Sequence, residues 1–235
     1  MTHESNYAPS LSAPRIDAGL RAHMNRVYAL MSGALALTGT IAWAIGRDPA
    51  LTQVLFGTSL KWVALFGPFA LAMILILFID KLSAAVATAM FVVYSAGMGV
   101  SMSVIFAVYT TASVAQAFGI TAVSFLGLSI YGYTTKRDLG PMGAFMVMGL
   151  FGLIIATIVN MFIGSSSMDF AISLLGVVIF AGLTAWDTQK IKTDYLSGVR
   201  GGDAEGRLAV MGALTLYLDF VNLMLYILKL MGQKK

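Results

Sequence analysis

The sequence predicts an all-α membrane protein with seven transmembrane helices, and three observations support this fold class. Hydrophobic residues make up 58% of the 235 residues and charged residues only 11%, with a mean hydropathy of +0.84, which is unlike a soluble globular domain. Residues 82–135 contain no Asp, Glu, Lys, Arg or His. Seven apolar runs reach about 17 residues or more, the length that crosses a bilayer.

The predicted spans follow a short polar segment. Residues 1–20 contain Pro9, Pro14 and scattered serines, so we expect a disordered tail followed by a single transmembrane domain at residues 21–235. No signal peptide is expected, because this segment lacks an apolar core and a small-residue cleavage site. The predicted spans are residues 27–45, 62–79, 83–109, 114–133, 141–163, 170–186 and 208–228.

Turn-forming and charged residues set the borders of these spans. The first ends before the sequence GRDP at residues 46–49, and the second lies between Lys61 and the Asp80-Lys81 pair, with a kink expected at Pro68. The uncharged stretch is too long for one helix, and we expect a break at residues 110–113 (TTAS). A GSSS turn at residues 164–167 ends the fifth span, and a glycine-rich loop at 197–202 separates the last two.

Basic residues favour a cytoplasmic N-terminus. With that orientation, the segments on the inner side hold ten basic residues and those on the outer side hold five, in line with the excess of Lys and Arg in cytoplasmic loops. The inner residues are Arg15, Arg21, Arg26, Lys81, Lys136, Arg137, Lys190, Lys192, Arg200 and Arg207; the outer ones are Arg47, Lys61, Lys229, Lys234 and Lys235. A re-entrant last segment would bring the last three lysines inside, but its length favours a full span.

The composition also excludes several classes of function. The net charge of +4 does not predict nucleic-acid binding, because the basic residues lie at the ends of apolar runs. The chain has no cysteine, so disulfides and thiolate metal sites are excluded. His3 and His23 precede the first predicted span, so we expect no histidine-ligated cofactor in the membrane.

Asp219 lies near the middle of the last apolar run, LAVMGALTLYLDFVNLMLYIL. A charged side chain there costs at least ~2.5–3.5 kcal/mol, so it is by default a functional-site hypothesis. Thr215 and Asn222 share its helical face, whereas Tyr217 points elsewhere. We interpret this face as directed inward and able to supply oxygen ligands. The alternative is a protonated carboxyl group that is hydrogen-bonded to a backbone carbonyl.

The best partner for Asp219 is Asp187, which follows the preceding apolar run. Alone, Asp187 could be solvated or paired with Lys190 or Lys192, but an antiparallel helix pair would bring it to Asp219. Two close carboxyl groups titrate as a coupled pair and share one proton over a wide pH range. Without that proton they form an oxygen-rich site suited to transient Ca²⁺ binding. A straight helix leaves Asp187 closer to the inner border, so the pair requires a longer sixth helix or a water-filled vestibule.

Three segments carry a family resemblance: YGYTTKRDL at residues 131–139, AWDTQKIK at 185–192 and ALTLYLDFVNL at 213–223. Together they resemble the bacterial branch of the Bax inhibitor-1 family, also called transmembrane Bax-inhibitor-motif or YccA-like proteins, over about residues 20–232. The resemblance implies six helices wrapped around a central seventh, a di-aspartyl pH sensor at Asp187 and Asp219, and a pH-sensitive Ca²⁺ leak. In relatives a basic residue at the inner end of the second span assists the pair. Here that region has no arginine, and Lys81, beside Asp80, is the nearest candidate.

Three functions therefore compete. The first is a proton-gated cation leak of the bacterial inner membrane, with Asp187 and Asp219 as the switch, Lys81, Thr215 and Asn222 as supporting residues, and Ca²⁺ as the permeant ion. The second is a regulator of an AAA-type membrane quality-control protease, with the first 20–25 residues as its handle. The third is an intramembrane aspartyl protease, which requires Gly-x-Gly-Asp. Leu-Tyr-Leu precedes Asp219 and Thr-Ala-Trp precedes Asp187, so we expect no enzyme and no cofactor.

Overall fold

The computed structural model describes residues 13–198 and 201–235, with side chains from residue 18 onward, and contains no β-strand within those ranges. Its helices are α1 (Ala13–Gly46), α2 (Pro49–Gly57), α3 (Leu60–Phe78), the 3₁₀ turn η1 (Ile79–Lys81), α4 (Ala84–Met102), α5 (Val104–Val108), α6 (Thr111–Thr134), α7 (Gly140–Ile163), α8 (Ser166–Ser197) and α9 (Gly202–Met231). Seven segments are long and apolar enough to cross a membrane. They are Ala18–Gly46, Leu60–Lys81, Ala84–Val108, Thr111–Thr134, Gly140–Ile163, Ser166–Ser197 and Gly202–Met231. The predicted seven-span, all-α fold is confirmed.

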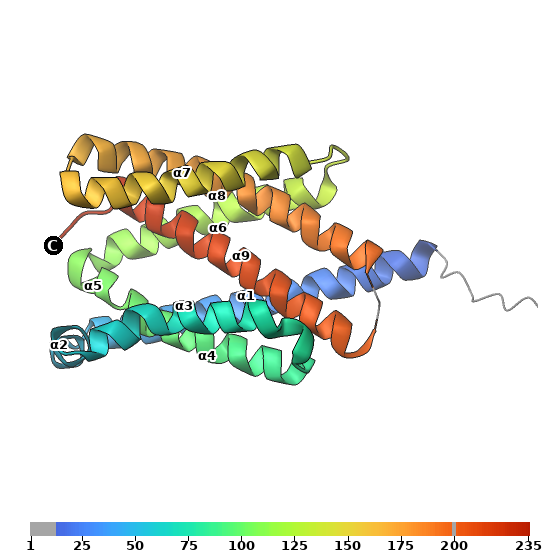
Figure 1. Ribbon diagram of the computed structural model, residues 1–235, viewed down its shortest axis with the longest axis horizontal. Helices are drawn as coiled ribbons and strands as arrows, with labels where there is room; N and C mark the ends of the chain where they lie inside the picture. Colours follow the sequence, from blue (N-terminus) through green and yellow to red (C-terminus); the bar gives the residue numbers. More distant parts are fainter. Residues whose placement is uncertain (1–12, 199–200) are drawn as a thin grey trace, which may run out of the picture.

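Helix α9 is the central helix of the bundle (Figure 1). It packs against α8, α1, α6 and α4, and it is the most buried of the seven spans. Helix α3 packs mainly on α4, and α7 packs on α8. The six surrounding helices therefore form an inner set of four in contact with α9 and two outer helices.

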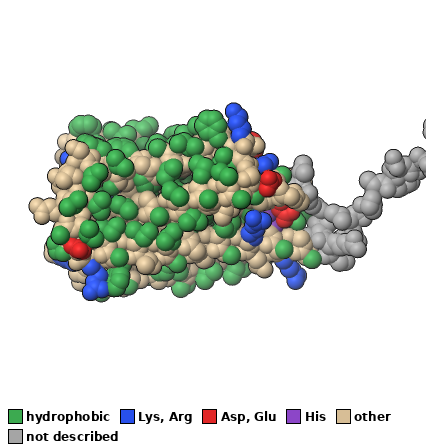
Figure 2. Space-filling model, turned by 90° about the horizontal axis from the view of Figure 1, so that it is seen from below, with side chains coloured by type: hydrophobic (Ala, Val, Ile, Leu, Met, Phe, Trp, Pro, Cys, Tyr) green, Lys and Arg blue, Asp and Glu red, His purple; other side chains and the backbone are tan. Residues whose placement is uncertain are grey.

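The bundle has two ends, which we name by the chain termini. The N-terminal end holds the start of α1, η1 and the α6–α7 and α8–α9 connections, whereas the C-terminal end holds α2, the α5–α6 and α7–α8 turns and residues 232–235 (Figure 1). In the view of Figure 2, apolar side chains cover the long side of the bundle, and charged side chains gather near its ends. Phe162 and Val123, for example, are 82% and 73% exposed. A continuous apolar surface of this kind is suited to lipid contact.

Short polar residues begin many of these helices. Ser83, Thr110 and Ser165 each accept a hydrogen bond from the backbone N–H three residues ahead, at the starts of α4, α6 and α8, which satisfies an otherwise free donor. The predicted break at residues 110–113 therefore coincides with the start of α6. At the predicted 164–167 turn, Gly164 ends α7 with φ of 70°, a conformation that favours glycine.

Several borders differ from the prediction. The tail predicted at residues 1–20 lies mostly outside the described residues, but the chain is already helical from Ala13, and His23 lies buried inside the first span. The third span is interrupted at Ser103, between α4 and α5. Helix α8 continues to Ser197, well past the border predicted at residue 186. Hydropathy marks where apolar sequence ends, and a helix can continue beyond that point into polar sequence.

Candidate functional site: paired aspartates between α8 and α9

Helices α8 and α9 run antiparallel, and two contacts fix their register around the aspartates. Toward the N-terminal end, Ile191 of α8 packs on Gly212 of α9. Toward the C-terminal end, Phe180 stacks on Tyr226 with ring centroids 5.8 Å apart. Asp187 and Asp219 lie between these contacts on the facing sides of the two helices. Helix α8 continues past Lys190, and this is the longer sixth helix that the sequence required for Asp187 to reach Asp219.

The carboxyl groups of Asp187 and Asp219 lie close enough to interact directly with each other. Both are buried, with 8% of Asp187 and 4% of Asp219 exposed. Oδ2 of Asp219 is buried and has no hydrogen-bond partner among the described residues. An ionised carboxylate can only accept hydrogen bonds, so a bond between two carboxyl groups requires a proton on one of them. The arrangement is suited to a pair of carboxyl groups that share a proton.

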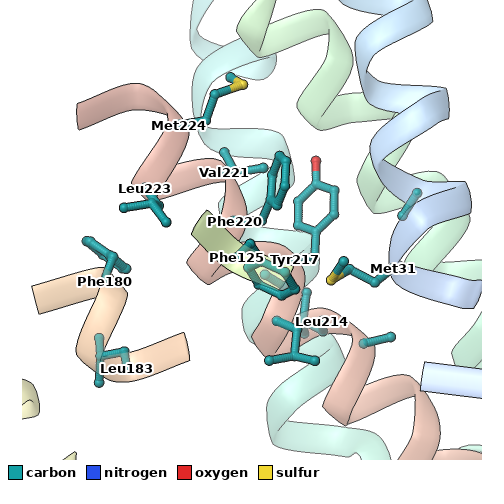
Figure 3. Packing of buried hydrophobic residues seen from close by; sticks show 14 of the residues in the cluster. Met31, Phe125, Phe180, Leu183, Leu214, Tyr217, Phe220, Val221, Leu223 and Met224 are labelled. Atoms are coloured by element: carbon teal, nitrogen blue, oxygen red, sulfur yellow. The ribbon is translucent and has the colours of Figure 1, made fainter. Parts of the chain in front are cut away.

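The other polar residues predicted on the face of Asp219 have different roles. Asn222 donates its side-chain amide to the carbonyl of Leu218 at 2.8 Å, within its own helix. Thr215 is half-buried one turn before Asp219. Tyr217 points to another side of α9, where its hydroxyl group is 2.7 Å from the Thr38 hydroxyl of α1 and its ring packs on Phe91 and Tyr94 of α4. Figure 3 shows Tyr217 in the buried core with Leu214, Phe220 and Val221 of the same helix.

Lys81 is not brought to the aspartates. It lies exposed in η1, at the N-terminal end, with its ammonium group 5.4 Å from the centre of the Phe78 ring. Besides Asp219, the charged residues with an electrostatic effect on Asp187 are Lys190 and Asp194 of α8. These two form an exposed ion pair with each other at 3.3 Å. The second span ends at the end of the bundle, whereas the aspartate pair lies inside it, so the prediction for Lys81 has no contact to support it.

A chain of hydroxyl groups approaches the pair from the side of α1 and α6. Tyr28 Oη lies 2.6 Å from Ser129 Oγ, and Ser129 Oγ lies 3.0 Å from Oγ1 of Thr188, the residue that follows Asp187. Thr188 in turn donates to the carbonyl of Thr184 at 2.8 Å. These residues could not be identified from the sequence, because isolated hydroxyl side chains are common in apolar helices and give no indication of their partners.

Two glycines allow the AWD segment at residues 185–187 to pack closely on its neighbours. Gly132 of α6 lies against the backbone carbonyl of Ala185, and a Cβ atom at position 132 would overlap that oxygen. Gly143 of α7 lies against the indole ring of Trp186, and a Cβ atom there would overlap the ring. Neither contact leaves room for a methyl group at the glycine. The segment that carries Asp187 is therefore held by α6 on one side and by α7 on another.

The protein ligands for a metal ion are few at this site. Within the described part of the chain, no three His, Cys, Asp or Glu side chains come together. Two carboxyl groups offer at most four oxygen atoms, whereas Ca²⁺ takes about six to eight. A cation between Asp187 and Asp219 would therefore keep part of its water shell. Such incomplete coordination suits transient binding during permeation better than a stable metal site.

The chain is similar to known membrane proteins over nearly its whole length. The family model described as "Inhibitor of apoptosis-promoting Bax1" matches residues 20–235. Inner membrane protein YbhL of Escherichia coli K12 is 41% identical over 228 residues, which cover 96% of this chain and 97% of that protein. An uncharacterized protein of Borreliella burgdorferi is 44% identical over 211 residues, 89% of this chain and 91% of that one. An uncharacterized protein of Rickettsia prowazekii is 42% identical over 220 residues, 93% and 92% of the two chains. The chain belongs to the Bax inhibitor-1 family of membrane proteins.

Proposed function

We propose that the protein is a pH-sensitive cation leak of the bacterial inner membrane, with Asp187 and Asp219 as the switch and Ca²⁺ as the permeant ion. The observation that carries this proposal is the close approach of two buried carboxyl groups on two different membrane-spanning helices. The inner-membrane location is suggested by the E. coli relative, which is named for it. An N-terminus in the cytoplasm is suggested by the basic residues at the N-terminal end of the bundle.

The proposed switch uses the change in charge of the pair. With one shared proton, the carboxyl groups bind each other and hold α8 against the central helix α9. When that proton is lost, two like charges face each other in an environment of low polarity, and their repulsion favours separation of the helices or entry of water and a cation. Flux should therefore increase as the pH is raised. Flux depends on pH because the closed arrangement of α8 and α9 needs the shared proton, which is lost as the pH is raised.

The test is Ca²⁺ flux into proteoliposomes between about pH 5 and pH 8. We expect the wild-type flux to rise by a factor between about 5 and 150, the usual range of coupling between a bound ligand and a conformational equilibrium. Asp187→Asn and Asp219→Asn should each flatten this dependence, because neither variant can place two negative charges in the pair. Asp169→Asn is the matched control, since Asp169 lies exposed in the first turn of α8 and should leave the profile unchanged.

Flux that responds neither to pH nor to the two substitutions would reject this proposal. The alternative function, regulation of an AAA-type membrane protease, would then take precedence. One observation favours it: α1 begins at Ala13 and extends past the other helices at the N-terminal end of the bundle (Figure 1). Removal of the first 20 residues should then abolish protease regulation and leave ion flux intact.

A further inference from the structure

Two adjoining cavities open at the C-terminal end of the bundle, away from the aspartate pair. One, of about 320 Å³, lies between α1, α5, α6 and α9. The other, of about 520 Å³, lies between the α1–α2 turn, α2, α5, the start of α6 and Lys235. Phe106 and Thr111 line both cavities, so the two lie side by side. They differ in chemistry, and this difference indicates an amphipathic occupant.

The first cavity is apolar. Its floor is formed by Phe220, Val221 and Met224, which Figure 3 shows projecting from α9. The walls include Trp43 of α1 and Phe118 of α6, which are 44% and 45% exposed. The cavity therefore opens on the lipid-facing surface. Its buried polar side chain, Thr38, is already hydrogen-bonded to Tyr217 and to the carbonyl of Ser95, which leaves an environment suited to a hydrocarbon chain.

The second cavity is polar and basic. Arg47 and Lys235 line it together with Thr52, Gln53 and Thr111. The guanidinium group of Arg47 stacks over Trp43 at 4.4 Å, and the ammonium group of Lys235 donates to the carbonyl of Phe106 at 2.6 Å. Neither cation forms an ion pair with any residue that the structure describes. The adjacent carboxylate of Asp48 is engaged by the backbone N–H groups of Ala50 and Leu51.

We propose that these cavities form one binding site for an acidic phospholipid. The phosphate-bearing headgroup binds between Arg47 and Lys235, and one acyl chain lies in the apolar cavity against α9. Charge complementarity supports the headgroup position, because two unpaired cations line a cavity at the end of a membrane-spanning bundle. Trp43 lies at the transition between the cavities, and tryptophan is typical of the boundary between headgroups and hydrocarbon. The site does not depend on the proposed ion leak.

The first measurement compares two lipids on the full chain. The delipidated protein in detergent is mixed with equal amounts of phosphatidylglycerol and phosphatidylcholine, and bound lipid is counted by native mass spectrometry. We expect phosphatidylglycerol to be preferred. Arg47→Gln and Lys235→Gln should each reduce this preference by about fivefold, which corresponds to about 1 kcal/mol for each basic residue near an anionic headgroup. Lys61→Gln is the control, because Lys61 lies over Trp62 and lines neither cavity.

The second measurement tests the acyl chain. Trp62 and Trp186 are replaced by Phe, so that Trp43 is the remaining tryptophan, and its fluorescence is quenched by phosphatidylglycerol brominated on its acyl chains. Ala115→Leu should reduce quenching at least twofold, because Ala115 lines the apolar cavity. Ala112→Leu, at an exposed position of α6 outside the cavity, should not.

Three results would overturn the proposal. They are equal binding of the two lipids, a preference that survives both Arg47→Gln and Lys235→Gln, and a preference that Lys61→Gln reduces as much as they do. If the tryptophan substitutions impair folding, the mass measurement, which uses all the native tryptophans, decides alone. A wild-type chain that retains acidic lipid through Arg47 and Lys235 supports the site even if Asp187→Asn and Asp219→Asn leave ion flux unchanged.

Discussion

Single hydroxyl groups link α1, α6 and α8 beside the aspartate pair. Tyr28, Ser129 and Thr188 are joined by hydrogen bonds of 2.6 and 3.0 Å, and Ser129 and Thr188 are buried. Hydrogen bonds between membrane helices average only about 0.6 kcal/mol and reach about 1.7 kcal/mol. These residues therefore tie three helices together at modest but measurable energy.

We predict that Tyr28 and Ser129 are energetically coupled. Tyr28→Phe and Ser129→Ala, alone and together, form a double-mutant cycle, and the free energy of unfolding in mixed lipid–detergent micelles should give a coupling of about 0.6–1.7 kcal/mol. Tyr131→Phe combined with Ser129→Ala is the control, because Tyr131 lies exposed on the same helix as Ser129. A coupling of zero for the first pair, or an equal coupling for both pairs, would contradict the prediction.

The meeting of some buried polar residues could be predicted from the sequence, and the meeting of others could not. Asp187 and Asp219 could be predicted because a carboxyl group at the edge or centre of an apolar run is costly without a partner. Lys81 was placed beside them only by resemblance, and the structure places it in η1 instead. Ser129 and Tyr28 could not be predicted, since a hydroxyl group is inexpensive in a membrane helix and its partner depends on which helices are neighbours.

At the scale of helices, close packing around the AWD segment depends on glycine. Trp186 lies against Gly143 of α7, where a Cβ atom would overlap the indole ring. Gly152 lies on the same helix with no atom within 4 Å of the position of such a Cβ. The two glycines have the same helical context, and they differ in whether a neighbouring helix occupies the adjoining space.

We predict that Gly143→Ala destabilises the bundle and that Gly152→Ala does not. Overpacking of this kind costs typically about 1–3 kcal/mol, whereas alanine in an open helical position is favourable by about 0.5–1 kcal/mol. Thermal unfolding followed by far-ultraviolet circular dichroism should therefore give a lower Tm for the first variant and an equal or higher Tm for the second. Equal Tm values for both variants would show that α7 moves away from Trp186 without cost.

The length of α8 illustrates how far element borders follow from sequence. The apolar run ends at Trp186, but the helix continues to Ser197. Lys192 donates to the carbonyl of Tyr133 at 2.8 Å, so this polar extension is fixed against the end of α6. That contact depends on which helix lies beside α8, and local sequence does not specify it. The extension matters because it continues α8 past Asp187.

For the whole molecule, the number of spans and their order could be predicted from hydropathy, because an apolar run of membrane length has few alternatives. The central position of α9 was predicted from the family resemblance alone. Its cause is visible in the structure, where α9 is the most buried span and packs against four other helices. Helix α9 also runs from the N-terminal end to the C-terminal end (Figure 1), and its 30 residues extend about 45 Å. It is therefore long enough to span the membrane fully.

The orientation of the bundle in the membrane can be predicted from its basic residues. Among the described residues, nine basic residues belong to segments at the N-terminal end and five to segments at the C-terminal end, so we expect the N-terminal end to lie in the cytoplasm. The chain has no cysteine, and single cysteines can therefore report position without further substitutions. In intact spheroplasts, a membrane-impermeant maleimide should label Ser167→Cys and Lys234→Cys, at exposed positions of the C-terminal end. Lys136→Cys, exposed in the α6–α7 connection at the other end, should react only after lysis.

The pattern of labelling separates the possible topologies. Reaction of Lys136→Cys in intact spheroplasts, with protection of the other two variants, would show the reverse orientation and remove the charge argument for a cytoplasmic N-terminus. Reaction of Lys234→Cys only after lysis, together with labelling of Ser167→Cys before it, would show that the last helix returns to the inner side. Such a result would contradict the full span of α9 and would place Arg47 and Lys235 on opposite sides of the membrane. The same measurement therefore tests the topology and one requirement of the lipid site.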